Sequence, residues 1–153
     1  MDNRDPVREY LNSVLESRME IKRVRRKLDL LEARALNVTS QLTGMPRGGG
    51  SDRDAVLAAL ADATADYYRR LAEAEQHELE VLSFIDSIPD QMQRVILKLR
   101  YVDRKRWPAV LSALQKEGVD IQTNWMFKLH GKALNAAREL YKEKYNHDET
   151  RDT

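Results

Sequence analysis

The residues with the clearest chemical potential lie together near residue 125. Gln122, Thr123, Asn124 and Lys128 stand at the expected start of the last long helix. If that helix enters a DNA major groove, the amides can pair bidentately with adenine and the lysine can donate to guanine. The alternative is structural, with Thr123 as a helix N-cap and Asn124 as a tolerated first-turn residue.

A second group of candidate residues is basic and would contact DNA phosphates instead of base edges. Arg104, Lys105 and Arg106 follow one another in an expected turn, and Lys132 lies further along the last helix. Such side chains bind phosphate oxygens and add affinity without sequence information. A three-residue basic turn can equally be a solvated loop.

The remaining reactive groups stand alone. His130 has no Asp, Cys or second His at metal-site or triad spacing, so we expect it to cap or to form a hydrogen bond. Cysteine is absent, which excludes disulfides, thiolate chemistry and cysteine-based zinc sites. The glycines at 48–50 lack the Lys-Ser/Thr of a phosphate-binding loop. We therefore expect neither an enzyme nor a bound metal or cofactor.

A long helix is expected to begin at Asp5-Pro6, because proline is favoured at the first helical position. Apolar residues then recur every seven positions, which is typical of a left-handed coiled coil. They are Val7, Val14, Ile21, Leu28, Ala35 and Leu42, with Tyr10, Val24, Leu31 and Val38 three positions further on. Such a helix runs about 38 residues, or roughly 57 Å.

The glycine-rich stretch 44–51 predicts a loop, after which Ser51 or Asp52 caps a second helix of about 36 residues. Its apolar stripe consists of Leu57, Leu60, Thr64, Tyr67, Leu71, Ala74, Val81, Ile85 and Ile88. Two helices of similar length joined by a short loop favour an antiparallel hairpin. We therefore predict that residues 1–88 form a coiled-coil stalk, and that this thinly buried stalk forms a homodimer.

Residues 89–145 predict three helices in a helix-turn-helix unit, so the fold class is all-α. The expected elements are a helix at 90–102, a turn at 103–106, an extended Trp107 before Pro108, a helix ending near Gly118, and the last long helix. Core residues of the last helix are expected at Trp125, Leu129, Ala133, Ala136 and Leu140, with Phe127 packing elsewhere. Residues 146–153 are expected to be a disordered tail.

The net charge of +1 conceals a strong division along the chain. Residues 1–44 carry +2, residues 45–89 carry −5, residues 90–145 carry +6, and the last eight carry −2. A basic C-terminal region is typical of a nucleic-acid-binding unit, although uneven surface charge without a partner is the alternative. No apolar run approaches the roughly 18 residues of a membrane span, so we expect a cytoplasmic protein without membrane contact.

Several short motifs resemble the fourth conserved region of bacterial sigma factors, and more closely the ArpU/RinA-type transcriptional regulators of phages and prophages. They are Met45-Pro46-Arg47-Gly48-Gly49, Ile88-Pro89, Arg94 to Tyr101, Trp107, and Leu129 to Leu134. The match covers residues 89–145 well and the preceding helices loosely. The connection at 115–121 is longer than in sigma factors, and Leu111 stands where a small residue is usual.

The resemblance implies a helix-turn-helix that binds double-stranded DNA and regulates phage transcription, with host RNA polymerase as a further partner. A second hypothesis is a structural DNA-packaging subunit, similar to a small terminase, or a protein-docking module. Ring assembly distinguishes packaging from regulation, because we expect the regulator to be a dimer.

Overall fold

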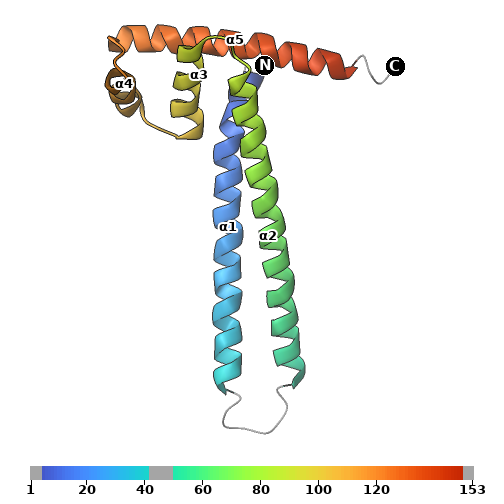
Figure 1. Cartoon of the computed structure of the whole chain (residues 1–153). Coiled ribbons are helices and arrows are strands. Elements are labelled where there is room, and N and C mark those ends of the chain that lie inside the picture. Colours follow the sequence, from blue (N-terminus) through green and yellow to red (C-terminus); the bar gives the residue numbers. More distant parts are fainter. Residues whose placement is uncertain (1–4, 42–49, 150–153) are drawn as a thin grey trace. The chain divides into compact units, whose positions relative to one another are not determined.

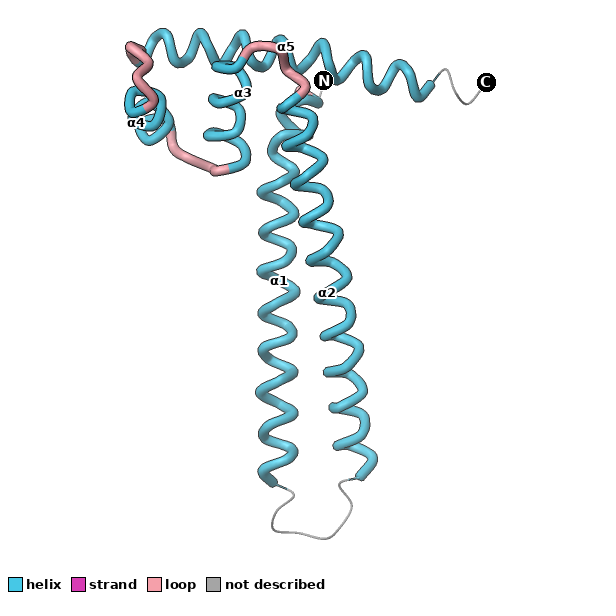
Figure 2. The backbone as a smooth tube through the Cα atoms, viewed as in Figure 1, coloured by secondary structure: helices cyan, strands magenta, loops and turns pink. Residues whose placement is uncertain are grey.

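The computed structural model describes residues 5–41 and 50–149, and its regular secondary structure in these ranges is entirely helical (Figures 1 and 2). The elements are α1 (Pro6–Gln41), α2 (Gly50–Asp86), α3 (Gln91–Leu97), the π-helical segment η1 (Lys98–Val102), α4 (Trp107–Lys116) and α5 (Thr123–Glu149). The all-α prediction is confirmed for the described residues.

Two boundaries differ from the prediction. Residues 42–49 of the predicted glycine-rich loop lie outside the described residues, but α2 already begins at Gly50, ahead of the expected caps Ser51 and Asp52. At the other end, α5 continues to Glu149, so residues 146–149 of the predicted tail are helical. Residues 150–153 lie outside the described residues.

The chain divides into two compact units at places that the sequence did not indicate. Residues 1–16 and 77–153 form one unit, here the head unit, and residues 17–76 form the other, the helix-pair unit. The predicted boundary at residue 88 differs because the ends of α1 and α2 supply core residues to the head unit. These residues are Val7, Leu11, Val14, Val81, Phe84, Ile85 and Ile88.

The core of the head unit joins these helix ends to every later element. α3 and η1 supply Ile96, Leu97, Tyr101 and Val102, α4 supplies Val110 and Leu114, and α5 supplies Met126, Ala133, Leu134 and Ala137. A continuous apolar cluster of this kind fixes α5 against the helices that precede it.

Helix starts in the head unit follow capping chemistry. Asp5 precedes Pro6 and accepts from the Val7 amide at 3.2 Å, and Asp90 caps α3 by accepting from the Gln93 amide at 3.0 Å. The prediction for Trp107 was wrong, because Trp107 is the first helical residue of α4. The extended residue is its neighbour Arg106, with ψ 156°, and Pro108 lies within the first turn, where its missing N–H leaves no hydrogen bond unmade.

The helix expected at 90–102 changes type halfway. After Leu97 the chain widens into η1, and the Asp103 amide donates to the Lys98 carbonyl at 2.8 Å, an i to i−5 bond. The wider turn brings both Tyr101 and Val102 into the core. No local sequence pattern indicated this change.

The end of α4 is closed by Gly118, as expected, in a left-handed conformation with φ 83°. The Gly118 amide donates to Gln115 and the Val119 amide to Leu114, which is the hydrogen-bond pattern of a Schellman motif. Val119 and Leu114 also belong to the same apolar cluster.

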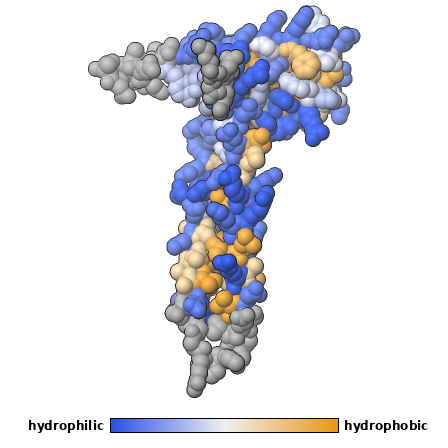
Figure 3. Space-filling view, turned by 180° about the vertical axis from the view of Figure 1, so that it is seen from behind, coloured by the Kyte–Doolittle hydropathy of each residue, from blue (hydrophilic) through white to orange (hydrophobic). Residues whose placement is uncertain are grey.

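In the helix-pair unit, α1 and α2 lie side by side and run in opposite directions (Figure 1). The predicted apolar positions of α1 form its most buried side, with Leu28 and Ala35 buried and Ile21, Val24 and Leu31 half-buried. The predicted Leu42 lies outside the described residues. In the view of Figure 3, hydrophobic residues of this unit gather toward the last turns of α1 and the first turns of α2.

Candidate nucleic-acid interface

The first turns of α5 present a polar and basic outer face. Asn124, Lys128 and Lys132 are exposed at helical spacing, on the side opposite the buried Met126. The Met126 amide donates to the Gln122 carbonyl at 3.0 Å, so Gln122 occupies the N-cap position and the alternative role of Thr123 as N-cap is wrong.

Trp125 also lies on this outer face, which corrects the sequence prediction. Its side chain is 61% exposed, and the Lys128 ammonium lies 5.2 Å from the centre of its ring. The predicted Ala133 is buried, and Leu129, Ala136 and Leu140 are half-buried against the core. The other fully buried residues of α5 lie one position after predicted ones, at Met126, His130, Leu134 and Ala137. The prediction placed Trp125 in the core because a Trp at helical spacing with Leu129 and Ala133 resembles a core residue.

The three residues of the basic turn differ in what they do. Arg104 has φ 57°, and its guanidinium donates to Asn12 Oδ1 on α1 at 2.8 Å, so it anchors the turn. Lys105 and Arg106 have exposed side chains. Of the predicted phosphate contacts in the turn, these two have side chains that make no hydrogen bond or ion pair with the described part of the chain.

An aromatic cluster links this turn to α5. Trp107 meets the rings of His130 and Phe127 edge-on, at 4.7 and 5.1 Å between ring centres. The Arg100 guanidinium lies over the Trp107 ring, 4.5 Å from the ring centre, and donates to the Lys105 carbonyl at 3.1 Å. The cluster therefore holds the turn and the first turns of α5 in one structure.

His130 lies at the centre of the cluster, with Nε2 2.9 Å from the Tyr101 hydroxyl. Burial lowers the pKa of His130 to about 4, and the charges of Arg8, Arg100 and Arg138 act in the same direction. The ring is therefore neutral near pH 7, and it shares one hydrogen bond with the Tyr101 hydroxyl through Nε2. The predicted hydrogen-bonding role of His130 is confirmed.

A serine–histidine contact in the head unit was not predicted from the sequence. Ser13 Oγ lies 2.6 Å from His77 Nε2, although 64 positions separate the two residues. Ser13 also donates its hydroxyl proton to the Tyr10 carbonyl. With its proton held there, Ser13 accepts from His77, so the pair links α1 to α2 and is not arranged for nucleophilic attack.

An ion pair fixes the start of α1 to α5. Arg138 donates to Asp5 Oδ2 through Nη2 at 2.6 Å and through Nε at 3.1 Å. This hydrogen bonding lowers the pKa of the Asp5 carboxyl below its usual value. Beside the pair lies a hollow of about 290 Å³, lined largely by Pro6, Val7, Tyr141 and Tyr145.

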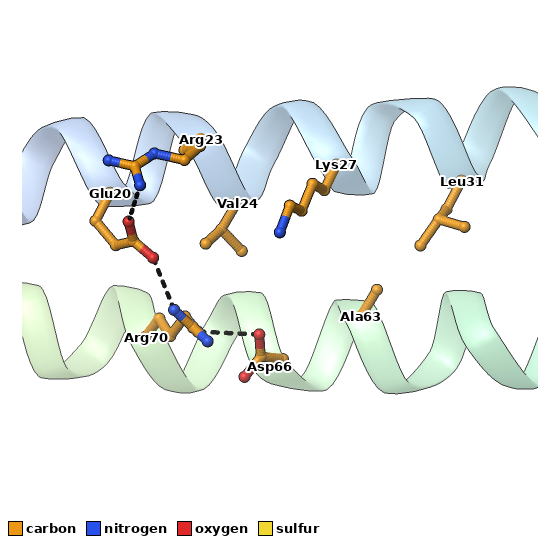
Figure 4. Close-up of a pocket in the computed structure, with 8 residues that line it drawn as sticks. All are labelled: Glu20, Arg23, Val24, Lys27, Leu31, Ala63, Asp66 and Arg70. Atoms are coloured by element: carbon orange, nitrogen blue, oxygen red, sulfur yellow. Dashed lines mark hydrogen bonds and ion pairs between the residues drawn. The ribbon is translucent and has the colours of Figure 1, made fainter.

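A second hollow, of about 240 Å³, lies in the helix-pair unit (Figure 4). Its floor is apolar, formed by Val24, Leu31 and Ala63. Its rim is a chain of charges in which Glu20 bridges Arg23 at 3.2 Å and Arg70 at 2.8 Å, and Arg70 also lies 3.0 Å from Asp66. The Glu20–Arg70 pair joins α1 to α2, and the other two pairs lie within one helix each.

Two searches within residues 5–41 and 50–149 were negative. No group of three or more His, Cys, Asp or Glu side chains there is arranged to hold a metal ion. No helix in those ranges combines the length and apolar character needed to cross a membrane.

Comparison of the chain with models of protein families, with curated proteins and with solved structures finds no match.

Proposed function

We propose that this protein is a sequence-specific DNA-binding regulator of transcription, of the phage or prophage kind that its motifs resemble. One observation carries the proposal: the first turns of α5 expose Asn124, Trp125, Lys128 and Lys132 on one outer face. Amide, aromatic and ammonium groups at helical spacing are the groups with which a recognition helix meets base edges and phosphates.

Each side chain has a distinct role in this proposal. Asn124 pairs with an adenine edge, and Lys128 donates to guanine. Lys132 lies about one turn beyond Lys128 on α5 and binds phosphate, as do the exposed Lys105 and Arg106. Gln122 and Thr123 lie at the helix start, where backbone N–H groups favour an anionic phosphate.

The head unit provides the rigid support that such a helix requires. α4 and α5 act as the helix-turn-helix, and the Trp107–His130 contact joins the start of α4 to the early part of α5. The net charge of +6 over residues 90–145 adds the long-range attraction for DNA. The helix-pair unit supplies the homodimer, so that two heads read two half-sites.

The test is selection from a random duplex library, with the wild type, Asn124→Ala and Lys128→Ala compared in parallel. We expect a defined motif for the wild type, with a different position of the motif relaxed in each variant. An exposed residue on the far part of the same helix, Glu143, gives the matched control Glu143→Ala, which should leave the motif unchanged. Selection without any motif contradicts sequence reading by α5.

A second candidate function is a DNA-packaging or assembly subunit, favoured by the exposed apolar residues of the helix-pair unit. Met19, Leu30, Leu36, Leu57 and Tyr68 are between 39% and 70% exposed. Such residues favour association with another chain. Light scattering separates the two functions, because a dimer supports the regulator and a ring of eight or more copies supports packaging.

A further inference from the structure

In the helix-pair unit, α2 carries two apolar stripes side by side. Its half-buried residues Leu60, Thr64, Tyr67 and Leu71 form the stripe that faces α1. Each is followed directly by an exposed apolar residue, and these four, Ala61, Ala65, Tyr68 and Ala72, are here called the second stripe. Their spacing of three and four positions places them on one face of the helix.

The corresponding positions of α1 are not apolar. Its inward residues Ile21, Val24, Leu28 and Leu31 are followed by Lys22, Arg25, Asp29 and Glu32. This face of α1 therefore carries long charged side chains, and the aliphatic stems of Lys22 and Arg25 can cover a stripe of small apolar residues while their charged ends stay in water. A helix with two adjacent apolar stripes is typical of a bundle, in which each helix contacts two neighbours.

The unit buries little by itself. Among its described residues, Leu28 and Ala35 alone are buried apolar side chains, whereas Tyr68 in the second stripe is 61% exposed. Two helices without a third layer have no enclosed core, and most helical stability comes from packing of an apolar face. Another helix on the second stripe would enclose it.

The net charges of α1 and α2 indicate which helix packs on the second stripe. Residues 17–41 of α1 carry seven Lys/Arg and three Asp/Glu, a net charge of +4, whereas residues 50–76 of α2 carry three and six, a net charge of −3. Packing α2 against α1 of a second copy brings opposite charges together. Packing α2 against α2 of that copy brings like charges together, which is unfavourable.

We propose that two copies of the helix-pair unit pack into a four-helix bundle in which the second stripe of α2 lies on α1 of the other copy. This inference deepens the homodimer part of the proposed function. In a two-fold bundle of two helix pairs, α2 lies opposite the other copy's α1 only when the two-fold axis runs parallel to the helices. Equivalent residues of the two copies then lie at the same height along the bundle.

The face is tested with one substitution at two positions. Ala65→Glu places a charge in the second stripe, whereas Ala59→Glu places it elsewhere on the exposed surface of the same helix. By sedimentation equilibrium, Ala65→Glu should weaken dimerisation by about 100-fold or more, since it buries an unpaired charge. Ala59→Glu should leave it unchanged, and circular dichroism confirms equal helix content. Equal dimerisation in both variants overturns the assigned face.

The orientation is tested with spin labels, because the chain has no cysteine of its own. Asp52→Cys and Glu73→Cys introduce single labelling sites at exposed positions near the two ends of α2 in this unit, outside the second stripe. The proposal predicts short inter-copy distances at both sites. An antiparallel bundle instead separates labels near the ends by about 30 Å along the axis, given 1.5 Å per residue, and overturns the proposal.

Duplex affinity is measured in the same samples, so that the two proposals fail separately. A wild-type monomer that still binds duplex DNA overturns the bundle and leaves DNA binding intact. A parallel dimer without duplex affinity supports the bundle and contradicts the proposed function alone.

Discussion

At the scale of single residues, Trp125 is the most informative side chain. It is 61% exposed and stands between Asn124 and Lys128, so its removal leaves no cavity. Trp125→Ala should therefore change the free energy of unfolding by less than about 0.5 kcal/mol. In the proposed complex its ring lies against a base edge, so duplex affinity should fall about tenfold or more.

Urea unfolding and a fluorescence-anisotropy titration on the same preparation check both parts of this prediction. Trp125→Phe retains an aromatic ring and should fall between the wild type and Trp125→Ala in affinity. If Trp125→Ala unfolds more easily and binds DNA normally, the residue serves the fold and not the interface.

His130 gives a prediction for pH. Its folded-state pKa of about 4 lies below the ordinary value of 6.5, so the unfolded chain takes up this proton first as the pH falls. The stability that the neutral ring provides is complete above pH 6.5 and is lost between pH 6.5 and 4, by about 3 kcal/mol at most.

Chemical denaturation at pH 7 and pH 4.5 measures this loss. His130→Gln has no proton to gain and should lose less stability between the two pH values than the wild type does. An identical loss in wild type and variant would show that other groups cause the acid sensitivity.

Some of the site residues could be placed from the sequence and others could not. The five predicted site residues on or beside α5 are all exposed, because polar and charged side chains rarely pack into a core. Arg104 could not be assigned from the turn alone, since its partner Asn12 is 92 positions away. Trp125 was wrongly predicted to be buried. The buried side of α5 includes the polar His130, whose hydrogen-bond partner Tyr101 lies on another element, and the sequence of α5 alone does not show this.

At the scale of the elements, replacing each of the two glycines of the head unit by alanine should change stability in opposite directions. Gly118 has φ 83° at the end of α4, whereas Gly131 lies within α5, and added Cβ atoms meet nothing within 4 Å at either position. Gly118→Ala should therefore destabilise by about 1 kcal/mol through backbone strain alone. Gly131→Ala should stabilise by up to about 1 kcal/mol through helix propensity.

Thermal unfolding of both variants beside the wild type provides the check, with each variant as the control for the other. Shifts of the same sign would contradict the assigned end of α4 or the continuity of α5 through residue 131.

The long elements were predictable and the short ones less so. The seven-residue repeat of α1 placed its start at Pro6, because the repeat is long and the Asp5-Pro6 cap is specific. The segment at 98–102 was not predictable as a π-helix, because its widening serves core contacts of Tyr101 and Val102 with other elements. The start of α4 shifted to Trp107 for a local reason, since proline is tolerated anywhere in the first helical turn.

At the scale of the whole molecule, the charge is divided between the two units. The basic stretch 90–145 lies in the head unit, and the helix-pair unit combines a basic α1 segment with an acidic α2 segment. The sequence suggested a boundary at Pro89, where the helix breaks. Helix ends and unit ends do not coincide here, because apolar residues of α1 and α2 complete the core of the head unit.

The most direct test of DNA binding by the head unit is the salt dependence of affinity for duplex DNA, measured with the full chain. If the head unit binds DNA, log Kd should rise steeply and linearly with log salt concentration, with a slope of about 0.9 for each phosphate contacted. Lys132→Ala should lower that slope by about one for each copy in the complex. Absence of duplex affinity at low salt, or affinity that does not respond to salt, would contradict DNA binding by the head unit.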